Sequence, residues 1–296
     1  MDRNLMGVFA PISTPFKSTG EVDFKGLEKN VGAYASAGIK GFLALGSNGE
    51  NKSLTNEEKL KVLEIVCKSK NTGQIVQAGC IFESTFETID MAKKMQRYKP
   101  DYLTLLPPCY FKSQMTDDAL YRYFTDVADA VDTPCLLYNA PQFSSGIVLS
   151  VKLLKRCAEH KGIVGVKDSS SGNMESILFA LRDDFNVMSG TINNFFSCLT
   201  MGGTGGVLSL ANSFPRLAVE LYELLSEKKY AEAIVLNDRA LQINKIVSGK
   251  GGVAAVKYAM DLAGFVGGEA RLPLLPLSDA DKAAIKGKLA AEGLIC

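Results

Sequence analysis

Short apolar runs alternate along the chain with longer segments in which apolar residues recur at helical spacing. The run around residue 165 is almost entirely apolar, which is typical of a strand buried on both faces. The predicted strands are Gly7–Ile12, Gly41–Leu45, Gln74–Gly79, Tyr102–Leu106, Cys135–Tyr138, Ile163–Lys167, Asn186–Ser189 and Gly205–Leu210. Eight alternations of strand and helix indicate parallel pairing with crossover helices, and eight strands close a barrel. We therefore predict an α/β fold, a (β/α)8 TIM barrel with a C-terminal helical extension; a doubly wound open sheet is the alternative.

Capping signals mark the starts of two of the intervening helices. Thr55 is followed three residues later by Glu58, and Thr116 precedes Asp117 and Asp118. After about residue 215 only helical patterns remain, over residues 218–226, 230–246, 252–262 and 279–291. The predicted domains are a catalytic (β/α)8 barrel over residues 1–225 and a C-terminal helical domain over residues 226–296.

Composition limits the partners that the chain can have. The 296 residues include 33 Lys and Arg against 32 Asp and Glu, for a net charge of +1, and no basic block stands out. We therefore expect neither nucleic acid nor an anionic membrane surface as a partner, and no apolar run reaches the length of a membrane span. Seven cysteines are scattered without paired spacing, which favours a reducing compartment. The prediction is a cytoplasmic protein that binds a small molecule.

A single histidine constrains the chemistry. His160 stands at the predicted end of a helix, where an exposed cation is favoured by the helix dipole. Zinc sites built on histidine, and Ser-His or Cys-His nucleophile pairs, are therefore excluded. An enzyme of this composition has to work with Lys, Tyr, Ser, Asp or Glu.

Lys167 is the first candidate for that chemistry, because it ends the apolar strand at residues 163–167. The active site of a barrel lies at the carboxyl ends of its strands. An ammonium group there is partly desolvated, which makes a neutral, nucleophilic amine accessible. Gly165, on the same face, is expected to leave room beside the lysine. The alternatives are a lysine that extends to solvent or one that pairs with Asp168.

Tyr138 ends the neighbouring predicted strand, so its phenol can approach Lys167 across the barrel mouth. Aldol cleavage needs a group that moves a proton to and from a hydroxyl, and a tyrosine with a hydroxyl relay can do so. The alternative is a core tyrosine whose hydroxyl bonds a carbonyl.

Two glycine-rich segments are candidates for anion binding. Gly46-Ser47-Asn48-Gly49 is a turn in which Gly49 permits positive φ, and its backbone N–H groups can form a nest for a carboxylate. A plain turn is the alternative. The glycines of residues 202–206 could bind phosphate, as in a phosphosugar isomerase, or could serve close packing.

The order of these motifs resembles that of a known family. The chain carries, in sequence order, Gly46-Ser47-Asn48-Gly49-Glu50, Pro108-Cys109-Tyr110, Tyr138-Asn139-Ala140-Pro141 and Gly165-Val166-Lys167-Asp168-Ser169. This order is similar to the dihydrodipicolinate synthase / N-acetylneuraminate lyase family of class I pyruvate-dependent aldolases, and the similarity covers nearly the whole chain.

The resemblance implies a lysine Schiff base with pyruvate on Lys167. It also implies that Tyr138 donates and accepts protons, and that Ser47 passes protons to Tyr110 from the adjacent subunit. Implied substrate-binding residues are Ser47, Asn48, Ser169, Gly190 and Val207. No metal or organic cofactor is implied, because the protonated imine is itself the electron sink. The expected assembly is a homotetramer, a dimer of dimers.

Departures from the family pattern bear on the second substrate. Synthases of the family commonly have Thr-Thr where this chain has Ser47-Asn48, and an arginine that binds the carboxylate of aspartate semialdehyde where residues 142–146 hold no cation. A carboxylate there would lose a charge-assisted contact worth about 1.5–3 kcal/mol. Lys167-Asp168-Ser169 also differs from the Lys-Phe-Thr-like segment usual in sialic acid lyases.

The turn at residues 46–50, Pro108-Cys109-Tyr110 and Gly267-Gly268-Glu269-Ala270-Arg271 look closest to the 4-hydroxy-2-oxoglutarate aldolase branch. The predicted reaction is reversible cleavage of a 4-hydroxy-2-oxo acid to pyruvate and an aldehyde such as glyoxylate. The alternatives are dihydrodipicolinate synthase, a sialic acid or 2-keto-3-deoxy acid lyase, and a non-enzymatic sensor that binds a 2-oxo acid.

Overall fold

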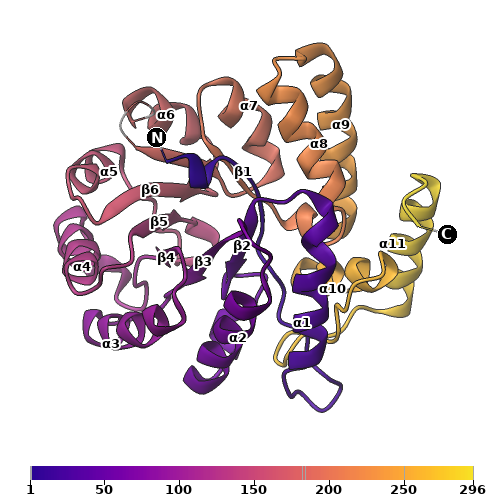
Figure 1. Ribbon diagram of the computed structural model, residues 1–296, viewed down its shortest axis with the longest axis horizontal. Helices are drawn as coiled ribbons and strands as arrows, with labels where there is room; N and C mark the ends of the chain where they lie inside the picture. Colours follow the sequence, from indigo (N-terminus) through magenta and orange to yellow (C-terminus); the bar gives the residue numbers. More distant parts are fainter. Residues whose placement is uncertain (1, 182, 184, 250, 296) are drawn as a thin grey trace. The chain divides into compact units, whose positions relative to one another are not determined.

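The computed structural model describes residues 2–181, 183, 185–249 and 251–295. Eight parallel strands form a closed barrel in which spatial order follows sequence order (Figure 1). The strands are β1 (Gly7–Ala10), β2 (Gly41–Ala44), β3 (Ile75–Gly79), β4 (Tyr102–Leu105), β5 (Cys135–Asn139), β6 (Ile163–Asp168), β7 (Asn186–Ser189) and β8 (Gly205–Val207). The predicted TIM barrel is confirmed, and the open sheet is wrong because the strands close. The first strand ends two residues and the last strand three residues earlier than predicted, and a 3-10 turn begins at Ser209 after the last strand.

The chain divides into two compact units, and the first consists of Met1–Gly7 and Ile75–Val207. Its helices lie outside strands β3 to β8 (Figure 1). They are α3 (Thr85–Met95), α4 (Asp117–Asp129), α5 (Val151–Ala158), α6 (Met174–Leu181) and α7 (Phe195–Thr200). The hydroxyls of Ser84, Thr116 and Ser150 accept N-terminal amide hydrogen bonds from α3, α4 and α5. Such caps contribute about 1 kcal/mol each.

A contact across the barrel shows which strand faces point inward. Gln77 on β3 and Met188 on β7 lie on strands that are not neighbours, yet Gln77 Nε2 is 3.8 Å from Met188 Sδ. Both side chains therefore point into the barrel. Lys167 pairs with Met188 in the register of β6 and β7, and paired residues of parallel strands share a face. Lys167 therefore points inward, and Asp168 outward.

The second unit consists of Val8–Gln74 and Leu208–Cys296. Its helices are α1 (Phe24–Ala33), α2 (Asn56–Ser69), α8 (Pro215–Ser226), α9 (Tyr230–Val247), α10 (Gly252–Leu262) and α11 (Asp279–Ala291). The predicted capping box is present: Thr55 and Glu58 satisfy each other's backbone amides at the start of α2. These units divide the chain differently from the predicted domain boundary at residue 225, which stays a prediction.

Short 3-10 turns connect several of these elements. They are η1 (Arg3–Leu5), η2 (Tyr34–Ala37), η3 (Asn51–Ser53), η4 (Gln96–Tyr98), η5 (Lys112–Gln114), η6 (Pro141–Phe143), η7 (Ile192–Asn194) and η8 (Ser209–Asn212). Among the described residues, none of the helices combines the length and the apolar character that crossing a bilayer requires.

Glycines in and before β8 serve close packing. A Cβ atom on Gly205 would lie 2.3 Å from the Gly7 carbonyl oxygen, and one on Gly203 would lie 2.3 Å from Cys198 Sγ. Of the two predicted interpretations of this segment, the packing one is therefore favoured. His160 follows α5, and its Nε2 lies 3.1 Å from Asp129 Oδ1; its side chain is 20% exposed, which is less than expected.

Candidate active site

The amine of Lys167 and the ring of Tyr138 lie together at the carboxyl ends of β6 and β5. The two residues are direct partners in the parallel register, and each is 3% exposed. Lys167 Nζ lies 3.9 Å from the centroid of the Tyr138 ring. The face of an aromatic ring attracts a cation by about 0.5–2 kcal/mol. An amine in this position can attack a ketone, and the resulting iminium charge would stay against the ring.

Asp168 lies on the opposite face of β6 and has partners of its own. Its Oδ1 accepts hydrogen bonds from Asn139 Nδ2 at 2.6 Å and from Ser170 Oγ at 2.8 Å. Burial raises the pKa of the Asp168 carboxyl, and the hydrogen bonds from Ser170 and Asn139 oppose that rise. The carboxyl therefore ties β6 to Asn139, the residue after Tyr138, rather than pairing with Lys167.

Gly165 serves a different purpose from the one expected. A Cβ atom there would lie 2.5 Å from the Asn186 carbonyl oxygen and 3.0 Å from Leu136 Cδ2. The glycine thus permits the close approach of β6 to β7. The expectation that it leaves room beside Lys167 is wrong, because Asn186 and Leu136 occupy that space.

Ser169, Gly190 and Val207 stand at the same end of neighbouring strands. The Gly190 amide donates to the Asp168 carbonyl at 2.6 Å, and a Cβ atom on Gly190 would lie 1.8 Å from Ser169 Oγ. Ser189 pairs with Gly206, so Gly190, the residue after β7, lies level with Val207, the last residue of β8. Ser169 Oγ is buried and, within the described part of the chain, has no hydrogen-bond partner. Such a hydroxyl can be satisfied by an oxygen of a bound ligand.

Tyr110 is placed differently from the other candidates. Its side chain is 81% exposed and packs edge to face against Phe111, which is 65% exposed. Its backbone amide donates to Glu83 Oε2 at 3.1 Å, which fixes the loop that follows β4. The side chain therefore projects from the surface of its own unit.

Ser47 and Asn48 belong to the second unit, in the turn that follows β2. The amides of Gly49 and Glu50 donate to the carbonyls of Gly46 and Ser47, both at 3.1 Å. The positive φ expected at Gly49 is wrong; the left-handed residues are instead Leu45, with φ of 59°, and Glu50, with φ of 52°. The left-handed backbone therefore lies at the residues on either side of the turn and not at the glycine within it.

A buried charged cluster next to this turn was not predicted from the sequence. Glu50 forms an ion pair with Lys257, and each side chain is 1% exposed. Burial lowers the pKa of Lys257, and the Glu50 carboxylate opposes that shift. Arg271 donates twice to Glu58, at 2.7 Å each, and this contact is the largest cause of the lowered pKa of Glu58. Lys257, a charged residue within the otherwise apolar run at 253–260, was the signal that could have revealed the cluster.

A second unpredicted feature is a cation beside the loop that follows β5. A Cβ atom on Gly146 would lie 3.2 Å from Lys112 Nζ. The stretch 142–146 has no cation of its own. The ammonium group of Lys112, in the loop after β4, lies beside it. Motif comparison could not find this contact because the two residues belong to different loops.

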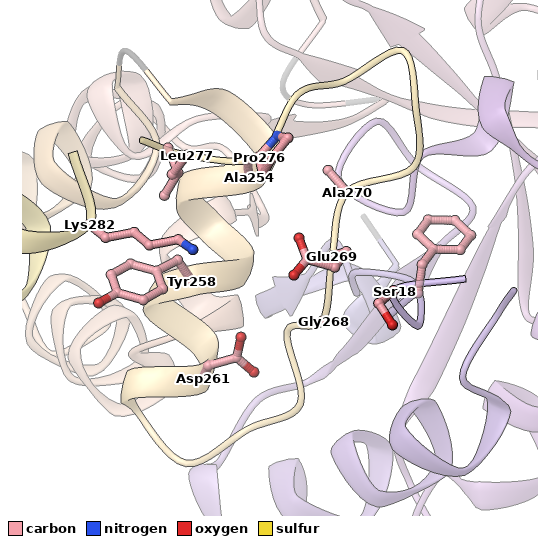
Figure 2. Close-up of a pocket in the computed structure, with 11 residues that line it drawn as sticks. Ser18, Ala254, Tyr258, Asp261, Gly268, Glu269, Ala270, Pro276, Leu277 and Lys282 are labelled. Carbon is pink, nitrogen blue, oxygen red and sulfur yellow. The ribbon is translucent and has the colours of Figure 1, made fainter. Parts of the chain in front are cut away.

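The second unit also contains a cavity of about 300 Å³, lined by residues of α10 and α11 and by the segments at Phe16 and Glu269. Figure 2 shows Glu269 and Lys282 facing this space from opposite sides. The candidate residues named above belong to other parts of the chain than this lining.

The described residues offer no metal-binding cluster, and three of their cysteines have raised thiol pKa values. They contain no group of three or more His, Cys, Asp and Glu side chains that could hold a metal ion. Burial raises the pKa of the Cys135, Cys157 and Cys198 thiols to about 12, so these thiols are protonated at neutral pH. Cys296 lies outside the described residues.

Comparisons with known proteins identify the family of this chain. The sequence model described as "Dihydrodipicolinate synthetase family" matches residues 4–292. A 4-hydroxy-tetrahydrodipicolinate synthase of Gluconacetobacter diazotrophicus is 32% identical over 292 residues, which cover 98% of this chain and 97% of the relative.

Two solved structures extend the similarity to three dimensions. A dihydrodipicolinate synthase from Acinetobacter baumannii, complexed with pyruvate, has a TM-score of 0.93 at 29% identity and covers 98% of this chain and 100% of its own. YagE, a prophage protein of the dihydrodipicolinic acid synthase family from E. coli K12 in complex with pyruvate, has a TM-score of 0.90 at 27% identity, with 98% and 99% covered.

Proposed function

We propose that this chain, which belongs to the dihydrodipicolinate synthetase family, binds pyruvate as a Schiff base on Lys167 and uses it in a reversible aldol reaction. The observation that carries the proposal is the buried Lys167 amine, 3.9 Å from the Tyr138 ring centroid at the carboxyl end of the barrel. Solved relatives in complex with pyruvate support the choice of ligand.

The chemistry follows from the amine. Lys167 Nζ attacks the ketone carbon of pyruvate, a C–N bond forms, and water leaves to give a protonated imine. The imine withdraws electrons, so loss of a methyl proton gives an enamine that attacks an aldehyde. The ring face of Tyr138 supports the cation, and the Tyr138 hydroxyl is proposed to move the proton of the new alcohol. Hydrolysis of the imine returns the lysine.

The remaining candidates enter the proposal on the family resemblance. The backbone of Ser47 and Asn48 would hold the pyruvyl carboxylate, and the Ser47 hydroxyl would pass protons to Tyr110 of an adjacent subunit. The exposure of Tyr110 in the single chain supports a role outside its own unit. Ser169, Gly190 and Val207 would line the pocket, and the unpartnered Ser169 hydroxyl supports that role. The assembly would be a homotetramer in the cytoplasm.

Condensation of pyruvate with aspartate semialdehyde is the proposed overall reaction. The names of the relatives favour this synthase reaction over the cleavage of 4-hydroxy-2-oxoglutarate that the motifs predict. Lys112 supports it too, because its ammonium beside Gly146 can receive the carboxylate of the semialdehyde. Cleavage of a 4-hydroxy-2-oxo acid remains the second candidate, since Ser47-Asn48 departs from the synthase pattern.

Borohydride reduction in the presence of pyruvate tests the Schiff base. The expected result is one pyruvyl adduct per chain by intact mass. The adduct should be lost in Lys167→Ala and kept in Lys161→Ala, an exposed lysine just before β6. Failure of the wild-type protein to form the adduct would overturn the proposal.

Assay of two reactions then separates the candidates. Formation of a dihydrodipicolinate product from pyruvate and aspartate semialdehyde is compared with release of pyruvate from 4-hydroxy-2-oxoglutarate. Lys112→Gln should raise the KM of the carboxylate-bearing second substrate about tenfold while trapping of pyruvate is unchanged. Turnover of 4-hydroxy-2-oxoglutarate alone would move the assignment to the aldolase.

A further inference from the structure

The turn that carries Ser47 and Asn48 has a strained backbone at both ends. Leu45 and Glu50 have positive φ without being glycine. Such residues cost free energy and persist only when the surrounding structure holds them in place. Two side chains outside residues 45–50 bond to the backbone of the turn. Thr14 Oγ1 donates to the Gly49 carbonyl at 2.8 Å, and Asn51 Nδ2 donates to the Leu45 carbonyl at 3.0 Å. These bonds hold the backbone on either side of Ser47 and Asn48, and Asn48 Nδ2 also donates to Ser209 Oγ at 2.5 Å. A further contact is made at Glu50.

The Glu50 side chain supplies that contact. One carboxylate oxygen pairs with Lys257 Nζ, and the other accepts the backbone amide of Arg271 at 2.9 Å. The carboxylate is therefore fixed by two partners from the C-terminal part of the chain. Because side chain and backbone of one residue move together, this attachment holds the left-handed conformation of Glu50.

Lys257 is itself fixed from three sides. It projects from α10, its Nζ donates to the Glu269 carbonyl at 2.7 Å, and the same nitrogen lies 4.4 Å from the Phe16 ring centroid. Figure 2 shows the segment at Gly268 and Glu269 running between α10 and the loop that carries Ser18. A Cβ atom on Gly267 would lie 1.9 Å from the Lys257 carbonyl oxygen, so the segment packs directly on the helix. The ammonium is therefore in contact with the Glu50 carboxylate, the Glu269 carbonyl and the Phe16 ring.

We infer that Lys257 is a positioning residue for the pyruvate site: through Glu50 it sets the conformation of the Ser47–Asn48 turn. The inference deepens the proposed function, on which it rests, because that turn is the proposed holder of the pyruvyl carboxylate. The C-terminal helices thereby gain a role in substrate binding as well as in stability.

The test replaces the ion pair in two steps. Lys257→Met leaves the Glu50 carboxylate buried without its cation, which destabilises the fold and releases the turn. In the double variant with Glu50→Gln neither charge remains, so the unfolding midpoint should return toward the wild-type value. The turn still lacks its contact with residue 257, although the side-chain oxygen of Gln at position 50 can still accept the Arg271 amide. In both variants the pyruvate concentration for half-maximal borohydride trapping should rise about ten- to a hundredfold. The maximal trapping rate should change by less than about threefold, because Lys167 and Tyr138 are untouched.

A second readout does not depend on activity. Hydrogen exchange at the Gly49 and Glu50 amides, both bonded within the turn, should be faster in the two variants than in the wild type. Lys282→Met, which removes a lysine from α11, is the matched control and should match the wild type in both measurements.

The outcomes separate the two proposals. The positioning role would be overturned by a double variant that regains both the wild-type unfolding midpoint and the wild-type pyruvate concentration for half-maximal trapping. Exchange of the Gly49 and Glu50 amides at the wild-type rate in the two variants would also overturn it. A wild-type protein that traps no pyruvate would overturn the proposed function and the pyruvate role of Lys257 with it. Amide exchange would then still decide whether Lys257 fixes the turn.

Discussion

The ends of β5 and β6 and the turn after β2 hold their candidate residues by different means. Tyr138 and Lys167 are paired in the parallel ladder of β5 and β6, and the hydrogen bond from Asn139 to Asp168 supports the strand ends. The turn at Ser47 is flanked by two left-handed residues, and a buried ion pair with the C-terminal part holds it. The nucleophile thus depends on local sheet geometry, whereas the proposed carboxylate-binding turn depends on contacts that are remote in sequence.

The largest expected effect separates the two functions of Tyr138. Tyr138→Phe keeps the ring face over Lys167 but removes the hydroxyl. We expect turnover to fall about 10²- to 10⁴-fold, the usual contribution of a positioned acid or base, while pyruvate trapping is nearly unchanged. Steady-state kinetics beside borohydride trapping measures both. Unchanged turnover would show that the ring, rather than the hydroxyl, carries the role, and equal losses in the two assays would show that the hydroxyl already acts in imine formation.

An intermediate effect, on stability and on pyruvate binding, is expected from Arg271, whose segment contacts the turn after β2. Arg271→Lys keeps the charge but loses the planar two-point contact with Glu58 and the bonds to the carbonyls of Gly20 and Ser53. Charge-assisted hydrogen bonds contribute about 1.5–3 kcal/mol, so the free energy of unfolding should fall by about that amount. Urea unfolding measures it. The pyruvate concentration for half-maximal trapping should also rise, since the backbone amide of Arg271 holds the Glu50 carboxylate. A variant with wild-type stability and a wild-type pyruvate concentration for half-maximal trapping would contradict the link between this cluster and the turn.

The smallest effect concerns Asp168 and depends on pH. Because burial raises its pKa above the ordinary value of 3.8, the folded state binds this proton more tightly than the unfolded chain does. The stabilisation is present below pH 3.8 and is lost as pH rises through the folded-state pKa. Relative to Asp168→Asn, the wild type should therefore lose stability across that window and then level off. Urea unfolding at a series of pH values tests this; a stability advantage of the wild type that grows with pH would contradict the sign.

The sequence was sufficient for features that repeat along the chain. Strand positions, helix caps and the adjacency of Tyr138 and Lys167 follow from periodicity and from the order of strands in a barrel. Features that depend on three-dimensional packing were missed or misassigned. Positive φ lies at Leu45 and Glu50 instead of Gly49, and the side chain of Glu50 is held from outside the turn. Gly165 accommodates β7, and Lys112 reaches Gly146 from another loop. Neither contact leaves a periodic signal.

The most direct test of the proposed chemistry is peptide mapping of the protein after reduction with borohydride in the presence of pyruvate. We expect a single modified peptide, with the pyruvyl group on Lys167. Modification of a different lysine, or an unmodified Lys167 at saturating pyruvate, would contradict the Schiff-base assignment.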